Sequence, residues 1–522
     1  MTPSDLRRLI KVEERIGQLA REKYGLQVMD IEFDVVPAQK MLEIMAYRTP
    51  TNISSWKYGR DYERMRTIHE NIEAGLPYEV IINSTPPRAY LMNTNPFAVQ
   101  VLVMAHVYGH VNMFTESKWF QAGRRDIMHY MAEANKRFNK YERRYGIDIV
   151  EKTVDAGHAL QFHSSPFDNE TENEKRERIF DQTMAKNRPI ETEYGDIVGS
   201  NREEAEVDIA LHNQNIWRKL NLKTPVEPTE DILRYIIDNS RVLEDWQKDV
   251  LEVLREEGRY FWPMIRTKYM NEGWATRVHE KICYDLFIEG LMDQKEHGQY
   301  NYSNALVKAM HKGQMNPYLI GSEIWKDIEE RYDKGRFGMA YDNCNDAKAK
   351  EEWDTMAMKG KDKIFSVMRG YTDWFFMQEF LTPELIDKIN LYIFKFEETM
   401  TTVDVVRTRH TAKQIRDLII NSFAHAIVPK IEVVNGNFQR KGGLVLRHAH
   451  TGVDLDMKYA TETLKHCHFL WGNDVALKTK LGDRDIRVNV KADGKVQAPK
   501  PEAKQPPPPD IWQTLTPNMM EW

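Results

Sequence analysis

The sequence predicts an α+β protein with a mostly helical core, a small N-terminal β element and a small C-terminal α+β domain. Apolar residues recur at helical spacing over much of residues 96–400, short alternating segments precede them, and residues 401–488 alternate between strand and helix patterns. The 522 residues are 41% hydrophobic and 11% aromatic, which is enough for two or three folded units with cores of their own.

The first half of the chain supplies the clearest elements. Residues 4–24 carry apolar positions one helical turn apart, whereas "MDIEFDVVP" alternates and stops at a proline, as a strand does. "YEVIINSTPPRAYLMN" predicts two strands joined at its adjacent prolines. "PFAVQVLVMAHVYGHVNMF", "DIMHYMAEANKRFNKYERRYG" and "IDIVEKTVDAGHAL" then predict three successive helices, with Gly146 ending the second.

Composition divides the chain into regions. We predict a helical core domain over residues 1–400, interrupted by a charged, solvated insertion at about residues 164–202. A small α+β domain follows over residues 401–488, in which Asn435-Gly436 is a typical hairpin turn. The Pro/Lys-rich residues 489–522 are predicted to be a disordered tail.

The overall composition excludes several functional classes. A formal net charge of −6 with 29% charged residues gives no basic excess, so nucleic acid is not an expected partner. The apolar runs are too short for a membrane span, and the N-terminus lacks the apolar region of a secretory signal. Three widely spaced cysteines form neither a disulfide framework nor a CxxC zinc motif. The chain is therefore expected to be cytoplasmic.

The string "MAHVYGHVNMF" is the first candidate for chemistry. His106 and His110 lie one helical turn apart, so both imidazoles project from one face and can reach one cation. Zinc peptidases use this spacing, but they carry a glutamate directly after the first histidine, where this chain has Val107. The alternative is a pair of buried histidines that bond to the backbone or to carboxylates.

A second string, "MNEGWATRVHEKI", supplies a third metal ligand. Its "NEGWA" is similar to the "NEGFA"-type segment in which gluzincin aminopeptidases present a zinc-binding glutamate, and it places Glu272 two helical turns before His279. His106, His110 and Glu272 would form a His₂Glu set in a zincin-like core, with a fourth position for water. The 162-residue separation of His110 from Glu272 exceeds that of those peptidases, and Glu272 with His279 could instead be a buried hydrogen-bonded pair.

A third string, "TVDAGHALQFH", offers a base in place of the missing glutamate. Asp155 and His158 are three residues apart, on one helical face. Asp155 could orient a ligand histidine or accept a proton from metal-bound water, and His158 could ligate or carry protons. The alternative is a capped helix end near Gly157. Asp155, His158 and His279 are therefore the candidate catalytic residues.

Several strings together resemble a known family. "INSTPPRAYLM", "MAHVYGHVNMF", "ERRYG…VDAGHALQ", "NEGWATRVH", "NPYLIG", "FMQEFLTPELI" and "LKHCHFLWGNDVAL" are similar to landmark segments of the SpoVR family, the stage V sporulation protein R-like proteins, in order from about residue 10 to about residue 480. The resemblance implies a link to the spore cortex, a peptidoglycan layer, in founding members. It also implies a PrkA-type serine kinase and a von Willebrand-type protein as stress-response partners.

Three functional hypotheses follow. The first is a metal-dependent hydrolase of amide or peptide bonds, with Zn²⁺ (or Fe or Mn) at the His-His-Glu site and a peptide or peptidoglycan precursor as substrate. The second is a non-haem iron or di-metal oxidoreductase, since two histidines and a carboxylate also form its facial triad, and Glu133 or Glu142 could hold a second ion. The third is a non-catalytic regulatory or scaffold partner of the kinase module.

Overall fold

The computed structural model confirms a mostly helical α+β protein. It divides into two compact units: unit 1 holds the described residues of 1–143 and 260–427, and unit 2 those of 144–259 and 428–501. The structure describes residues 3–46, 79–164, 170–186, 202–310, 315–398, 403–425 and 428–498.

A three-stranded sheet begins unit 1. Its strands β1 (Glu32–Val36), β2 (Glu79–Ile82) and β3 (Arg88–Met92) lie in the order β1-β3-β2, with β1 parallel and β2 antiparallel to β3. The predicted strand before Pro37 and the predicted hairpin across the adjacent prolines are both confirmed. Helix α4 (Phe97–Glu116) follows β3 almost directly, so the sheet fixes where this helix starts.

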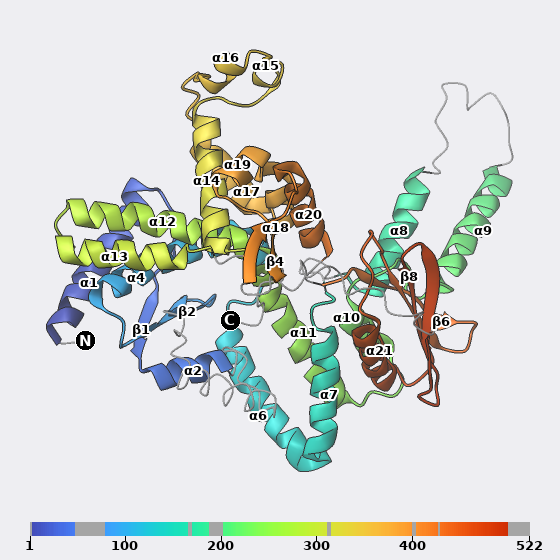
Figure 1. Cartoon of the computed structure of the whole chain (residues 1–522). Coiled ribbons are helices and arrows are strands. Elements are labelled where there is room, and N and C mark those ends of the chain that lie inside the picture. The colour runs from blue at the N-terminus through green and yellow to red at the C-terminus, as the bar shows by residue number, and fades with distance from the viewer. Residues whose placement is uncertain are drawn as a thin grey trace. The chain divides into compact units, whose positions relative to one another are not determined.

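Three helices form the centre of unit 1. Helix α12 (Lys268–Ile288) packs against both α4 and α14 (Pro317–Asp333) (Figure 1). α4 is long and apolar enough to cross a membrane by length and composition, but almost all of it is buried inside the protein, as in a core helix. The apolar core around these helices also takes side chains from α1 (Pro3–Gln18), α17 (Gly360–Gly370) and α18 (Asp373–Phe380).

Small residues allow these helices to approach closely. A Cβ atom on Gly109 of α4 would lie 2.5 Å from the Cα atom of Ala275 in α12. On the opposite side of α12, a Cβ atom on Gly273 would lie 2.3 Å from the carbonyl carbon of Gly321 in α14. Both contacts are with backbone atoms, which cannot rotate away, so the two crossings require these glycines. Because the backbones approach so closely, side chains that flank the crossings on neighbouring helices come into contact with one another.

Unit 1 contains further elements besides these three helices, and two of them, α6 (Ile127–Tyr145) and α11 (Asp245–Arg266), continue into unit 2. These further elements are α1 (Pro3–Gln18), the π-helical turn Leu19–Lys23, α2 (Ala38–Ala46), α5 (Lys118–Gln121), α6 (Ile127–Tyr145), α11 (Asp245–Arg266), α13 (Gln294–Val307), α15 (Met339–Asp342), α16 (Ala347–Glu351), α17 (Gly360–Gly370), α18 (Asp373–Phe380), α19 (Pro383–Lys388), β4 (Phe394–Glu398), β5 (Val403–Arg407) and α20 (Ala412–His425).

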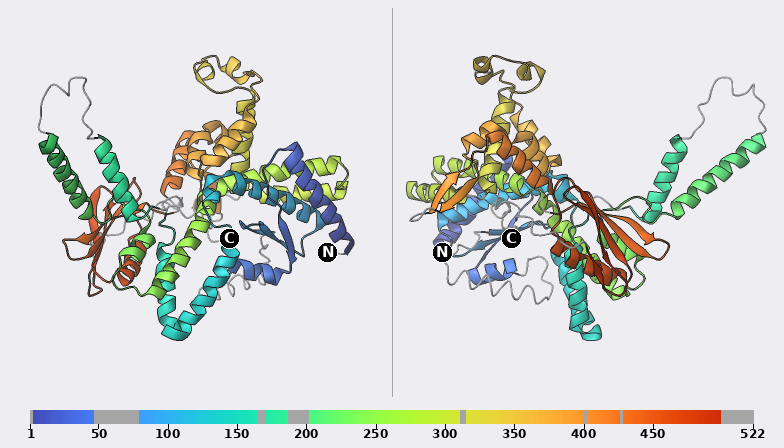
Figure 2. Two further views of the ribbon diagram at one scale, coloured as in Figure 1. Left: turned by 180° about the vertical axis from the view of Figure 1, so that it is seen from behind. Right: turned by 45° about the vertical axis from the view of Figure 1, so that its right-hand side comes forward.

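Unit 2 combines helices with a five-stranded sheet of order β10-β9-β8-β7-β6. Helix α21 (Met457–Trp471) packs against strands β8 (Val475–Leu481) and β9 (Arg484–Val490) of this sheet, which are drawn in red in Figure 2. The elements of unit 2 are α7 (Ile147–Leu160), α8 (Glu172–Lys186), α9 (Arg202–Asn221), α10 (Ile232–Asn239), β6 (Ile431–Phe438), β7 (Gly443–His448), α21 (Met457–Trp471), β8 (Val475–Leu481), β9 (Arg484–Val490) and β10 (Val496–Gln497).

The hairpin of residues 431–448 differs from its prediction. Asn435 and Gly436 lie within β6, at shifts in its register with β7, and the turn falls after Phe438. The prediction placed the turn wrongly because Gly436 has another role. A Cβ atom there would lie 1.9 Å from the hydroxyl oxygen of Tyr235, so the glycine admits a tyrosine against the strand.

The units also differ in outline from the regions predicted by composition. Residue 400 lies between β4 and β5, which pair antiparallel within unit 1, and the units separate between residues 427 and 428. The predicted charged insertion includes helix α8, while residues 187–201 lie outside the described residues. β10 extends the second sheet past residue 488, and residues 499–522 of the predicted tail lie outside the described part.

Candidate metal centre

Helix α4 presents two buried histidines side by side. His106 and His110 are each 3% exposed, and their ring centroids are 4.6 Å apart in an edge-to-face arrangement. Val107, at the position of the zinc-peptidase glutamate, is fully buried in the apolar core. The residue that interrupts the peptidase motif is therefore a packing residue, and any base must come from another element.

Glu272 reaches both histidines from α12. Its Oε2 atom lies 3.3 Å from the Nε2 atom of His106 and 3.6 Å from that of His110. The crossing at Gly109 and Ala275 brings the two helices close enough for these three side chains to meet. The three residues proposed as metal ligands from the sequence, 162 positions apart at their widest gap, thus lie together.

Glu79, the first residue of β2, completes the cluster. Its Oε1 atom lies 3.7 Å from His106 Nε2, and the ligand atoms of Glu79, His106 and His110 all lie within 4.8 Å of one another. Sequence reasoning missed this residue. The available signal was an acidic residue at the start of an otherwise apolar strand, "EVII", which is an expensive place for a carboxylate without a partner.

These separations are close to those between the ligands of one metal ion, and the shortest, 3.3 Å between His106 Nε2 and Glu272 Oε2, is also a long hydrogen bond. Ligand atoms bonded at about 2.0–2.1 Å in a tetrahedral site lie roughly 3.3–3.4 Å from one another. An N–H···O hydrogen bond usually spans about 2.7–3.2 Å. The distances of 3.6 and 3.7 Å are longer than a hydrogen bond and are compatible with groups that share a cation.

The outward-facing nitrogen of each histidine has a hydrogen-bond partner of its own. The Nδ1 atom of His110 lies 2.9 Å from Asn271 Oδ1, and the Nδ1 atom of His106 lies 2.9 Å from the Nδ1 atom of His279. An amide oxygen only accepts, so His110 carries its proton on Nδ1 and turns the Nε2 lone pair inward. Histidines that bind metals are commonly held in this way.

The four central groups perturb one another strongly. Burial raises the pKa of Glu79 to about 7, with the charge of His106 opposing this rise and the charge of Glu272 adding to it. Burial opposes the charged form of His106, but the carboxylates of Glu79 and Glu272 outweigh it and raise the pKa of that imidazole. Burial and the neighbouring His106 lower the pKa of His110 to about 4. Burial also disfavours the charged form of Glu272, yet the two histidines hold the pKa of this carboxyl below its usual value.

The candidate catalytic residues are divided between the units. His279 lies beside the cluster in unit 1, in contact with His106. Asp155 and His158 belong to α7 of unit 2, where the Nε2 atom of His158 lies 3.7 Å from Glu257 Oε2 and Asp155 lies near enough to His466 to influence its ionisation. Asp155 and His158 thus belong to a different compact unit from His106 and His110.

Tyr318 is a second residue that sequence reasoning missed. It follows Pro317 at the start of α14, capped by Asn316, and its ring centroid lies 5.9 Å from that of His106. Burial and the charges of Glu272 and Glu79 raise the pKa of its phenol well above the ordinary value, so it is a neutral hydrogen-bond donor. The motif "NPY", a capping residue followed by proline, could have located this helix start.

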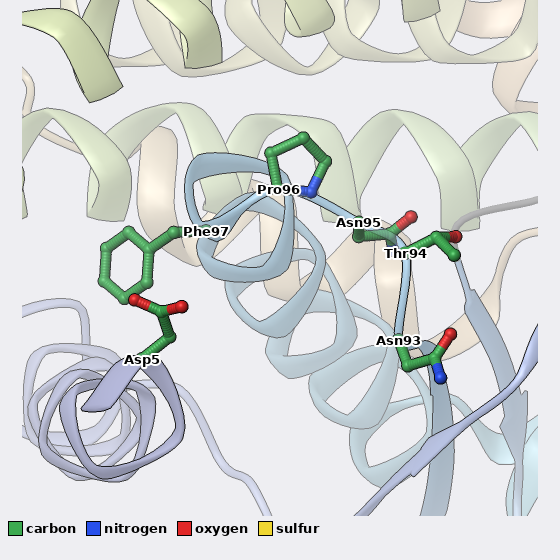
Figure 3. Close-up of a pocket in the computed structure, with 6 residues that line it drawn as sticks. All are labelled: Asp5, Asn93, Thr94, Asn95, Pro96 and Phe97. Atoms are coloured by element: carbon green, nitrogen blue, oxygen red, sulfur yellow. The ribbon is translucent and has the colours of Figure 1, made fainter. Parts of the chain in front are cut away.

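Two other features lie apart from the cluster. A pocket at the N-terminal end of α4, lined by Asp5 and residues 93–97, contains none of the cluster residues (Figure 3). Its nearest lining residue on α4, Phe97, precedes His106 by nine positions, or about 14 Å along the helix axis. Glu133, considered above as a ligand for a second ion, lies on the surface of α6 and pairs with Lys136 at 2.6 Å.

The fold and the cluster define an α+β protein in which Glu79, His106 and His110 could hold one metal ion, with Glu272 in contact with both histidines. The comparisons identify its family. The chain belongs to the SpoVR family: residues 4–427 match SpoVR like protein, and residues 429–482 match the SpoVR-like C-terminal domain. The two matches meet where the compact units separate after residue 427.

One similar protein is the uncharacterized protein YcgB of Escherichia coli (strain K12). It is 26% identical over 506 residues, which covers 91% of this chain and 92% of YcgB. The similarity therefore extends through both units. No solved structure matches the chain.

Proposed function

We propose that the protein is a metal-dependent hydrolase with a zincin-like core, in which His106, His110 and Glu272 bind Zn²⁺. The observation that carries the proposal is the set of ligand-atom separations of 3.3 and 3.6 Å around Glu272 Oε2, close to those of a tetrahedral site. A zinc ion held there would polarise a carbonyl group and make its bound water acidic.

Glu79 is the proposed general base. Zinc peptidases carry their base directly after the first histidine, where this chain has Val107. Glu79 takes over that role from β2, because its carboxylate lies beside the imidazole of His106. A pKa of about 7 suits a group that must accept and return a proton near neutral pH. During reaction, Glu79 Oε1 accepts the proton of the attacking water and returns it to the leaving nitrogen. Tyr318 donates a hydrogen bond from its phenol to negative charge that develops on the substrate oxygen.

The substrate class follows from the chemistry and the family. A His₂Glu zinc site with a carboxylate base is suited to amide bonds. The link of SpoVR proteins to the spore cortex favours a peptide or a peptidoglycan precursor made in the cytoplasm, where we propose that the protein acts. The PrkA-type kinase and the von Willebrand-type protein remain its proposed partners.

Metal analysis of the purified full-length chain and of three variants tests the proposal. We expect about one zinc per chain, retained in Glu79→Gln and in the surface control Glu133→Ala, and lost in Glu272→Ala. Hydrolysis of amide substrates, including peptidoglycan stem peptides, should vanish in Glu79→Gln and persist in Glu133→Ala. Iron with an oxygen-dependent spectrum would overturn the hydrolase in favour of an oxidoreductase.

A further inference from the structure

A series of hydrogen-bonded side chains leads outward from His106, away from the two carboxylates. The Nδ1 atom of His106 lies 2.9 Å from His279 Nδ1. The other nitrogen of His279, Nε2, lies 2.9 Å from Asn304 Oδ1. Asn304 Nδ2 in turn donates to Glu280 Oε1 at 3.2 Å, and Lys308 Nζ donates to the same oxygen at 2.9 Å. His279 and Glu280 lie on α12, Asn304 lies on α13, and Lys308 is the C-cap residue of α13.

The chemistry of the last groups fixes the direction of every bond in the series. Lysine can only donate and an ionised carboxylate can only accept, so Asn304 must turn its NH₂ group toward Glu280. Its Oδ1 atom then faces His279, which must carry a proton on Nε2 to donate to it. The Nδ1 atom of a neutral His279 is left as an acceptor, so His106 donates from its own Nδ1 atom.

We infer that His279 and Asn304 are positioning residues that hold His106 in the tautomer and orientation with its Nε2 lone pair facing Glu272 and Glu79. This inference rests on the proposed metal site. It also gives His279 a different role from that of a base, because both of its ring nitrogens are already engaged by His106 and Asn304 and neither faces the carboxylates.

The buried position of His279 supports this role. The side chain is fully buried and lies about two helical turns beyond Glu272 on α12, so the same helix supplies a metal-facing carboxylate and the support for a metal-facing histidine. A single residue, Asn271, holds His110 in the corresponding tautomer, because its Oδ1 atom accepts the hydrogen bond from His110 Nδ1; Asn271 directly precedes Glu272. Asn304 is the one member of the inner series that comes from α13, so it can be altered without changing α4 or α12.

Binding of Co²⁺ to the full-length chain tests the inference. We expect His279→Leu and Asn304→Leu to weaken Co²⁺ binding by about 10–100-fold, as losses of such supporting partners do. His279→Asn keeps an acceptor for His106 Nδ1–H and should recover most of the affinity. Asn301→Leu, at an exposed asparagine of the same helix α13, is the matched control and should bind as the wild type does.

A spectroscopic signature separates positioning from general stability. In the Co²⁺-loaded chain, each ligand imidazole should give one exchangeable, strongly shifted Nδ1–H proton signal, two in the wild type. His279→Leu should remove the signal of His106 and leave that of His110. Wild-type affinity with both signals retained in His279→Leu and in Asn304→Leu would overturn the inference.

The metal-free chain provides a test that does not depend on the proposed function. With ¹⁵N-labelled histidine at alkaline pH, long-range ¹H–¹⁵N spectra should show His279 protonated on Nε2 and His106 on Nδ1, assigned by the loss of each signal in His279→Leu and His106→Leu. A His279 protonated on Nδ1 would overturn the inference. If the wild type bound neither zinc nor Co²⁺, the hydrolase proposal would fail while these spectra still decided the tautomers.

Discussion

Two helix crossings, one in each unit, look alike and differ in what surrounds them. In unit 1, His106 of α4 lies 3.3 Å from Glu272 of α12, beside the close contact of Gly109 with Ala275. In unit 2, His158 of α7 lies 3.7 Å from Glu257 of α11, and its neighbour Gly157 makes close contact with Leu254. Both crossings therefore place a histidine against a glutamate next to a glycine.

The surroundings separate a candidate metal site from a simple contact between a histidine and a glutamate. The first crossing adds His110 and Glu79 to the pair, and the outward nitrogens of both histidines have fixed partners. Among the described residues, the groups with metal-binding spacing include Glu79, His106 and His110 but not His158. A histidine facing a glutamate across two helices is thus common to both crossings, whereas convergence of further ligands marks only one of them.

Adding one methyl group to each glycine should break the two crossings to very different degrees. In Gly109→Ala the new Cβ atom meets the Cα atom of Ala275, which cannot move without shifting α12, so we expect a loss of about 3 kcal/mol or more in the free energy of unfolding. In Gly157→Ala it meets the end of the Leu254 side chain, 2.3 Å away, which can rotate, and about 1 kcal/mol is expected. Denaturant unfolding of both variants measures this, and equal losses would contradict it.

Removing one histidine from each crossing sharpens the comparison. His106→Ala deletes a proposed ligand and should weaken zinc binding by roughly two orders of magnitude or more, since a His₂Glu site is left with two protein ligands. His158→Ala should leave zinc affinity unchanged. The zinc-induced rise in melting temperature, which follows binding to the folded state alone, reports both effects. Loss of zinc binding in His158→Ala would show that α7 contributes to the site.

The pH dependence of metal binding should distinguish the first crossing further. Glu79 has a pKa of about 7 and the pKa of His106 lies above its usual value, so below neutral pH a cation bound beside Glu79 and to His106 must displace protons from both groups. Affinity should therefore rise as pH increases through about 7. Each proton released adds up to about tenfold in affinity per pH unit. Zinc titrations of Glu79→Gln should give a shallower slope, by about one proton, and an unchanged slope would exclude Glu79 from the site.

The smallest expected effect concerns the support of α12. Asp373 of α18 accepts the backbone N–H groups of Tyr269 and Met270 at 2.9 Å each, at the first turn of the helix that carries Glu272. Asp373→Asn keeps one acceptor and loses the other, so we expect a loss of about 1 kcal/mol in stability. Zinc affinity should change less than in His106→Ala. Thermal unfolding with and without zinc measures both quantities.

Local patterns predicted the elements well, because each depends on neighbouring residues. The strand "MDIEFDVVP", the hairpin around the adjacent prolines and helices α4, α6 and α7 all follow from spacing and from chain breakers. Asn435-Gly436 misled the prediction because the reason for its glycine is Tyr235, which lies 201 positions earlier in the chain. Long-range contacts of that kind leave no local pattern.

The candidate site shows the same division. His106 and His110 could be found together because one helix holds both, and Glu272 could be found from the resemblance of "NEGWA" to a known ligand segment. Glu79, Asn304 and Tyr318 come from three further elements, and only the folded chain places them near the histidines. Asp155 and His158 lie in unit 2 and stay a prediction, because a histidine and a carboxylate on one helical face can serve either packing or chemistry.

Helix α4 is enclosed on every side, and this has a consequence for how freely its sequence can vary. All residues from Ala98 to Phe114 are buried, whereas α6 buries only Ile127, Met131, Ala134 and Phe138, which share one face. Substitutions in α6 should be tolerated with helical periodicity, at two of every three or three of every four positions. In α4 no such periodicity is expected, because every position is buried. Substitutions would be poorly tolerated throughout the segment around the two histidines, so tolerance alone would not distinguish ligands from packing residues.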